Sequence, residues 1–244
     1  MWTRKELKER GKAAFKRNYW KSVVAGIVVM LLSGAAFNSS RTSGGYDEWK
    51  SELSTVVEQS GISLTVLIWT LLGVMGVALL FSLAMTLFLR NPAEVGTNRF
   101  FLKNAREPAS LKELLYAFRS GNYLNIVWAQ FLVGLFIALW SLLLVIPGII
   151  KTFEYMMVGY ILADEPDMAA MDALRKSKQM MKGHKWNAFV LGLSFLGWEL
   201  LGVLTFGILD IFYVRPYVEA TFAELYLALK QQPMDRLENG TIER

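Results

Sequence analysis

The residues of this sequence best placed for chemistry are ionisable side chains that interrupt long apolar stretches. Charged groups are costly in the interior of a bilayer, so those found there are candidates for binding ions, protons or polar headgroups. Arg215 and Glu219 lie one helical turn apart with Pro216 between them, which predicts an ion pair beside a backbone carbonyl that the proline leaves free. The complete set of candidate intramembrane residues is Lys151, Glu154, Glu199, Asp210, Arg215, Glu219 and Glu224.

Two hypotheses account for these charges. In the first, the last apolar stretch carries a polar site for an ion, a proton or a headgroup. In the second, the charges pair with one another or extend to the interface on their flexible chains, and they serve to hold helices together. We expect Lys151, Glu154 and Glu199 in the outer half of the membrane, where reaching the interface is cheap.

Other kinds of site lack the residues that they need. The sequence has no cysteine and a single histidine, His184, without the H-E-x-x-H spacing of a zinc protease. Ser141 and Ser194 lie in apolar stretches without a histidine to act as their base. No phosphate-binding loop of the form G-x-x-x-x-G-K-S/T occurs. The sequence therefore predicts a protein that is not an enzyme and that holds neither a metal nor a cofactor.

A second set of candidates consists of basic residues at three points where a polar stretch gives way to an apolar one. They suit anionic lipid headgroups, and they equally fit the excess of positive charge that orients membrane proteins. The net charge of +5 has the same explanation, because no aromatic and basic platform for nucleic acid accompanies it. The residues of this set are Lys16, Arg17, Arg119, Lys182, His184 and Lys185.

Hydrophobic residues make up 54% of the chain and are gathered in long blocks. Blocks of about twenty apolar residues are long enough to cross the hydrocarbon core of a bilayer. The first block also fits a signal peptide, an alternative disfavoured by the long basic segment before it and the further blocks after it. We expect one polytopic membrane domain over residues 1–244, with spans at 22–37, 62–89, 124–146, 149–163, 186–205 and 208–229.

Counts of lysine and arginine set the expected orientation. The stretch 38–61 is acidic and is placed outside, whereas 90–123 is basic and is placed inside. Both termini are then cytoplasmic. Local signals predict that Pro92 ends the second span, that Pro147-Gly148 forms the turn between the third and fourth, and that Asp167 caps the helix that follows.

Three polar stretches have apolar residues at helical spacing, which predicts amphipathic helices on the cytoplasmic leaflet. The first lies within residues 1–21, where Leu7, Gly11, Ala14 and Phe15 share one face. The second starts near Pro108 and Ser110 and carries Leu111, Leu114, Leu115 and Phe118, and the third covers 167–182. The predicted fold is all-α, with six transmembrane helices as three hairpins plus three amphipathic interfacial helices.

The chain also shows signs of an internal repeat. Each predicted amphipathic helix is followed by a short basic or polar junction, then by a hairpin that ends at a proline: Pro92, Pro166 or Pro233. A three-fold hairpin repeat would divide the chain into 1–92, 108–166 and 167–233, with a polar tail at 234–244. The alternative is that any basic helix followed by a span looks alike.

Several segments of the second half occur in an order typical of one family. They are Ile146-Pro147-Gly148-Ile149-Ile150, Tyr160-Ile161-Leu162-Ala163-Asp164-Glu165-Pro166, Ser177-Lys178-Gln179-Met180-Met181-Lys182-Gly183, Ser194-Phe195-Leu196-Gly197-Trp198, and Pro216-Tyr217 with Thr221 and Tyr226. In these segments the chain resembles the bacterial integral-membrane family known as domain of unknown function 975. The resemblance implies a polytopic, multi-pass protein of the bacterial cytoplasmic (inner) membrane, and it carries over no catalytic or binding residue.

Two functions follow as hypotheses. The first is a non-enzymatic membrane protein that organises lipid, or binds a membrane partner, through basic interfacial helices. The alternative is a small transporter or channel that uses the charges of the sixth span, for which Arg215 and Glu219 must face a water-filled cavity. The expected partners are anionic headgroups of membrane lipids, with a protein partner or a second copy of the chain as further candidates, and no nucleic acid.

Overall fold

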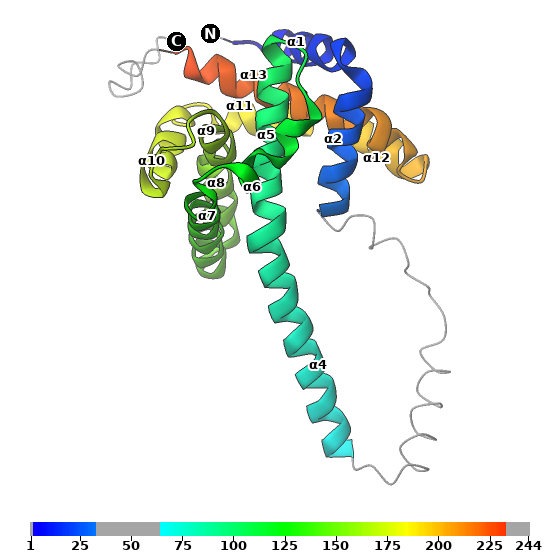
Figure 1. The fold of residues 1–244 in the computed structure, drawn as a ribbon, viewed down its shortest axis with the longest axis vertical. Coiled ribbons are helices and arrows are strands. Elements are labelled where there is room, and N and C mark those ends of the chain that lie inside the picture. Colours follow the sequence, from blue (N-terminus) through cyan, green and yellow to red (C-terminus); the bar gives the residue numbers. More distant parts are fainter. Residues whose placement is uncertain (1, 33–63, 233–244) are drawn as a thin grey trace.

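The computed structural model describes residues 2–32 and 64–232, and within these two ranges the chain forms helices and turns without a strand (Figure 1). The predicted all-α fold is thereby confirmed. The predicted external stretch at 38–61 and the tail at 234–244 lie outside the described residues.

Four stretches of the described helices are long and apolar enough to cross a membrane: Ile68–Arg106, Tyr123–Leu143, Val145–Asp164 and Lys185–Leu204. The other two predicted spans correspond to α2 (Tyr19–Leu32) and α13 (Arg215–Lys230), whose helices have 14 and 16 residues. The arrangement of six spans as three hairpins stays a prediction.

The longest element is a continuous helical rod made of α4 (Leu64–Met85), the π-helical turn Thr86–Arg90 and α5 (Asn91–Arg106), as Figure 1 shows. The expectation that Pro92 ends this helix was wrong. The backbone N–H of Asn91 donates to the carbonyl of Thr86, so the wider turn continues the helix up to the proline. Pro92 then occupies the first turn of α5, where its missing N–H is not needed.

The two halves of this rod have opposite surroundings. All side chains of α4 whose burial is described are exposed, and the helix is apolar on every side, which suits contact with lipid. In α5, by contrast, Val95, Phe100 and Phe101 are buried in the main core. The rod therefore joins a helix that extends beyond the assembly to a helix at its centre.

Helix α5 is the central element of the core. It contacts α9 (Val158–Asp164), α13 and α1 (Arg4–Arg17), and it also contacts α2. Helix α1 lies along α13 at the end of the molecule opposite the tip of α4 (Figure 1). The apolar face predicted for α1 packs on protein: Leu7 and Phe15 are buried, and a Cβ on Gly11 would lie 2.7 Å from Thr221 Oγ1.

The predicted third and fourth spans form a helical hairpin of α7 (Tyr123–Leu143) and α8 (Val145–Tyr155), which α9 extends. The expected turn at Pro147-Gly148 lies earlier, at Leu144, whose backbone is extended. Pro147 falls in the first turn of α8, where it fits without loss of a hydrogen bond. Gly148 has another role: a Cβ there would lie 2.1 Å from Ser141 Oγ, so glycine lets α8 approach α7.

The second and third predicted surface helices are shorter than expected. The second is a 3-10 turn, Leu111–Leu115, followed by α6 (Tyr116–Arg119), and Ser110 Oγ accepts the N–H of Lys112. The third is α10 (Ala170–Met180), which begins after Ala169. The prediction of Asp167 as its cap was wrong, because Asp167 Oδ1 accepts a hydrogen bond of 2.6 Å from Asn122 Nδ2.

The last predicted hairpin is irregular. Its first arm is split into α11 (Lys185–Leu193) and α12 (Leu196–Leu204). The turn expected at Phe206-Gly207 is confirmed, since both residues have positive φ, of 51° and 81°. The second arm begins with a π-helical turn, Asp210–Val214, and continues as α13 with Pro216 in its first turn.

The close approach of α5 to the loop after it yields a test of this packing. A Cβ on Gly96 would lie 2.1 Å from the carbonyl oxygen of Leu114, a backbone atom that cannot rotate away. We expect Gly96→Ala to lower the free energy of unfolding by about 1–3 kcal/mol, measured by thermal unfolding of the protein in detergent. Gly192→Ala is the control, because nothing lies within 4 Å of its Cβ position and alanine favours the helix. Equal stability of the two variants would contradict the packing.

Candidate functional site

The predicted intramembrane residues do not form one site, and the structure divides them into separate groups. Glu154 is only 6% exposed and forms ion pairs with two lysines. Its Oε2 lies 2.6 Å from Lys151 Nζ, and its Oε1 pairs with Lys185 Nζ from the start of α11. The expectation that Glu154 lies in the outer half of the membrane stays a prediction, although its partner Lys185 belongs to the predicted basic junction at the start of α11. This group links α8 to α11, and both oxygens of its one carboxylate are engaged.

The charges of the last arm are arranged differently from the prediction. Arg215 pairs with Asp210 at 3.7 Å rather than with Glu219. Glu219 is partly buried on α13 and, within residues 2–32 and 64–232, forms no ion pair; the charge of Glu94 on α5 lies near enough to affect its carboxylate. Sequence reasoning missed Glu94, because ending the second span at Pro92 placed it in a cytoplasmic loop.

The remaining two predicted carboxylates lie apart from these groups. Glu224 is buried between α13 and α1, where it faces the charges of Arg10 and Arg17. Glu199 is exposed on α12 and has no ion-pair partner in the described ranges 2–32 and 64–232. Among those residues no group of three histidine, aspartate or glutamate side chains has the arrangement of a metal site.

The predicted cationic set is only partly free. Lys16, Arg119 and Lys182 are exposed and, in the part of the chain that the structure describes, form no ion pair. Arg17 is exposed as well, and its guanidinium donates to the carbonyl of Asn104. Lys185 is engaged with Glu154.

His184 does not add charge to this set. Burial lowers the pKa of its imidazole, although the contact with Gln232 acts in the opposite direction. Its Nε2 lies 3.1 Å from Gln232 Oε1, and its ring centroid lies 5.9 Å from that of Trp2. The lowered pKa favours the neutral imidazole near pH 7. The ring contacts Trp2 and Gln232, which lie near the two ends of the described chain.

Two exposed tryptophans stand beside these cations. Trp20, near the start of α2, and Trp186, near the start of α11, are each 71% exposed. Trp20 follows the exposed Arg17 by three residues, and Trp186 follows the exposed Lys182 by four. Tryptophan next to lysine or arginine at the start of an apolar helix is typical of the headgroup level of a membrane.

The structure also shows an ionic cluster that sequence reasoning missed. Lys230 of α13 pairs with Asp164 and Glu165, and Lys176 of α10 pairs with Glu165 at 2.6 Å. Tyr226 donates its hydroxyl hydrogen to Asp164 at 3.0 Å. The cluster holds the ends of α9, α10 and α13 together, and its carboxylates belong to the Asp164-Glu165-Pro166 segment of the family resemblance.

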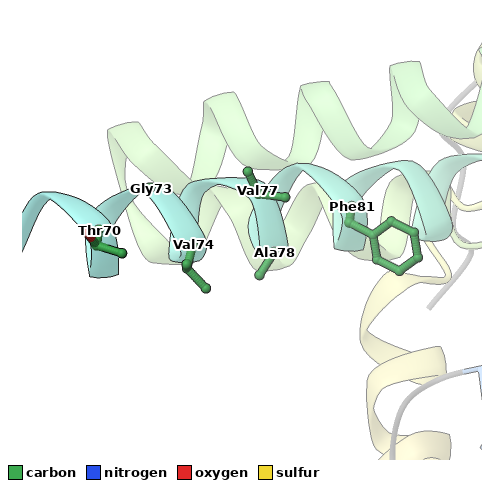
Figure 2. A pocket seen from close by; sticks show the side chains of 6 residues that line it. All are labelled: Thr70, Gly73, Val74, Val77, Ala78 and Phe81. Carbon is green, nitrogen blue, oxygen red and sulfur yellow. The ribbon is translucent and has the colours of Figure 1, made fainter.

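A shallow apolar groove runs along α4. Figure 2 shows its lining residues in a row on this one helix: Thr70, Gly73, Val74, Val77, Ala78 and Phe81. The hydroxyl of Thr70 donates within the helix to the carbonyl of Val66, so the groove offers an apolar surface. It suits an acyl chain or another helix and carries no reactive group.

The comparison with known families bears on the second half of the chain. Residues 142–233 match the family described as protein of unknown function (DUF975). The matched region runs from the end of α7 through α13, and it contains every segment on which the sequence resemblance rests. No curated protein and no solved structure matches the chain.

The Glu154 group provides a test of whether intramembrane charges are structural. Glu154→Gln leaves two lysine ammonium groups beside a neutral amide, so we expect the free energy of unfolding to fall by roughly 3 kcal/mol. Glu199→Gln removes an exposed carboxylate without a partner and should change it by less than about 0.5 kcal/mol. Thermal unfolding in detergent measures both, and a neutral effect of Glu154→Gln would contradict a structural role.

Proposed function

We propose that the protein is a non-enzymatic, multi-pass membrane protein that binds anionic lipid headgroups through cations at the junctions before its apolar helices. The observation that carries the proposal is the pairing of exposed tryptophan with exposed cation, at Trp20 with Arg17 and at Trp186 with Lys182. The tryptophans set the depth of the headgroups, and the cations supply charge at that depth.

The free charge of Lys16, Arg119 and Lys182 supports binding over a purely structural role. A cation that already has a carboxylate partner gains little from a lipid phosphate, whereas an unpaired one gains a full charge-assisted contact. These residues belong to or directly follow α1, α6 and α10, which lie in the upper half of Figure 1, away from the free tip of α4. In Figure 1 α1 lies farther from the tip of α4 than α6 and α10 do, so their contact with one membrane surface is part of the proposal.

Helix α1 adds further exposed cations to this surface. Its apolar face is buried on α13, while Arg4, Lys5, Arg10, Lys12, Lys16 and Arg17 are exposed. Because the protein itself holds α1 in place, the helix presents its cations to a membrane without inserting its apolar face. In the proposed orientation this face is cytoplasmic, as are both termini, and the membrane is the bacterial inner membrane.

The proposal predicts that three particular cations control lipid binding. We expect the triple variant Lys16→Gln, Arg119→Gln and Lys182→Gln to bind phosphatidylglycerol at least tenfold more weakly, since each cation near an anionic surface contributes about 1 kcal/mol. Thermal stabilisation of the purified protein by phosphatidylglycerol against phosphatidylcholine measures the effect, which added salt should weaken.

The matched control is Arg106→Gln, Lys112→Gln and Lys178→Gln. These three cations are also exposed and without an ion pair among the described residues, so the control loses the same charge away from the junctions and from α1. Equal losses in the two triple variants would show general charge attraction rather than a site. Unchanged phosphatidylglycerol binding in the first triple would overturn the lipid proposal and favour a protein partner.

The proposed orientation has its own test. The chain has no cysteine, so Ser110→Cys and Lys178→Cys each introduce one exposed thiol. We expect a membrane-impermeant maleimide to label both positions only after the cells are lysed, because both lie on the proposed cytoplasmic face. Labelling of either position in intact cells would contradict that orientation. A cysteine at Ser43, in the stretch placed outside, is the positive control.

A further inference from the structure

The turn between α7 and α8 is apolar and strongly exposed. Five consecutive side chains at this turn, here called the apolar turn, are between 62% and 88% exposed: Leu142, Leu143, Leu144, Val145 and Ile146. From residue 120 to residue 150 the chain contains no charged side chain. An exposed apolar patch of this kind marks a contact with another protein or with a membrane.

The backbone of the apolar turn fits surroundings without water. Leu144 donates its N–H to the carbonyl of Trp140 at 3.1 Å, and Gly148 donates its N–H to the carbonyl of Leu144 at 3.3 Å. Pro147 has no N–H that would need a partner. The hydroxyl of Thr152 donates within the helix to the carbonyl of Gly148 at 3.1 Å. Polar groups in hydrocarbon must be bonded within the protein, and these groups meet that requirement.

The other end of the hairpin is covered by a helix that needs water. Helix α10 packs on α7, α8 and α9, and Ser177 Oγ donates to the carbonyl of Glu154 at 2.7 Å. The outer face of α10 carries the exposed charges of Asp172, Arg175 and Lys178. Because exposed charges are costly in hydrocarbon, the hairpin lies outside the bilayer core at least as far as Glu154.

The ion pairs of Glu154 mark the same level. Lys185, one of its two partners, directly precedes Trp186, which is at the headgroup level in the proposal above. Lys151 also directs its ammonium group to Glu154, at 2.6 Å, and thus away from the apolar turn. A lysine near the far surface of a membrane would extend toward that surface instead. The direction of Lys151 therefore indicates that the polar surroundings lie on the side of Glu154.

The distance from this level to the apolar turn is too short for a crossing. Glu154 follows Val145 by nine residues, which an α-helix spans in about 13 Å. The hydrocarbon core of a bilayer is ~30 Å thick. A hairpin that enters the core beside Glu154 therefore ends near its middle. Figure 1 shows that α4 extends in the same general direction as this hairpin and well beyond it.

We propose that α7 and α8 form a re-entrant hairpin, which inserts the apolar turn among the acyl chains of the cytoplasmic leaflet and returns without crossing the bilayer. Hydrocarbon fits this turn better than a protein partner does, because five consecutive exposed residues face every direction rather than one side. The inference rests on the membrane surface proposed at Lys182 and Trp186, but it does not depend on the charge of the headgroups. It places Glu154 at the cytoplasmic surface rather than in the outer half.

The depth of the apolar turn can be measured with one label, because the chain contains no cysteine. The full-length Leu144→Cys variant carries a bimane in phosphatidylcholine vesicles, whose nitroxide lipids have the nitroxide near the headgroup or near the end of the acyl chain. We expect the deep nitroxide to quench the bimane at least twofold more strongly. The control is Lys178→Cys, on the outer face of α10, which the deep nitroxide should quench no more than the shallow one. Leu142→Cys provides a second position in the turn if the first variant does not fold.

A hairpin that crosses the bilayer gives different results. Stronger quenching of position 144 by the shallow nitroxide would place the turn at a headgroup surface, and no quenching by either lipid would show that protein covers it; each result overturns the inference. In intact cells a membrane-impermeant maleimide should label Ser43→Cys and leave Leu144→Cys unlabelled, whereas labelling of position 144 would show a crossing. Phosphatidylcholine carries no net charge, so failure of this inference is distinct from failure of anionic lipid binding.

Discussion

The burial of α5 is the constraint on which the rest of the structure depends. Several polar groups on this helix find partners inside the assembly, and those partners hold the other elements in place. Asn104 donates to the carbonyl of Ala14 at 2.8 Å, which fixes α1. Arg99 donates to the carbonyl of Ala163 at 2.6 Å, pairs with Glu113 and stacks on Tyr116. Helices α1, α6 and α9 are thereby tied to the same rod.

Charged groups within the apolar stretches are accommodated in two physically different ways. Glu154 lies between two lysines, and such a closed group adds rigidity and offers nothing to a ligand. Glu94 and Glu219 form no ion pair in the described parts of the chain, so they do not join helices as Glu154 does.

Sequence patterns predicted the helices and turns more accurately than the contacts that these helices make with the rest of the chain. Hydropathy and turn signals gave the all-α fold, the extent of α7 and the turn at Phe206-Gly207, because each depends on neighbours in the chain. The spacing of Leu7 and Phe15 predicted an apolar face on α1, but it does not say whether lipid or α13 covers that face. Asp167 had the features of a helix cap, and a distant Asn122 took its carboxylate instead.

The candidate site was predicted only in part, for a related reason. Glu219 was found because it stands in an apolar stretch. Glu94 was missed because proline in a helix usually clashes with the carbonyl one turn before it, and this local rule ended the span at Pro92. The π-helical turn at Thr86–Arg90 changes which carbonyl faces the proline, and sequence patterns give little warning of such a turn.

The continuation of the rod through Pro92 also changes how an internal repeat should be divided. If Pro92 does not end its helix, the proline that follows the first unit is Pro108, just after α5. Pro166 and Pro233 occupy the corresponding places after α9 and α13. Under this division α5, α9 and α13 are equivalent helices, and α5 packs against both of the others.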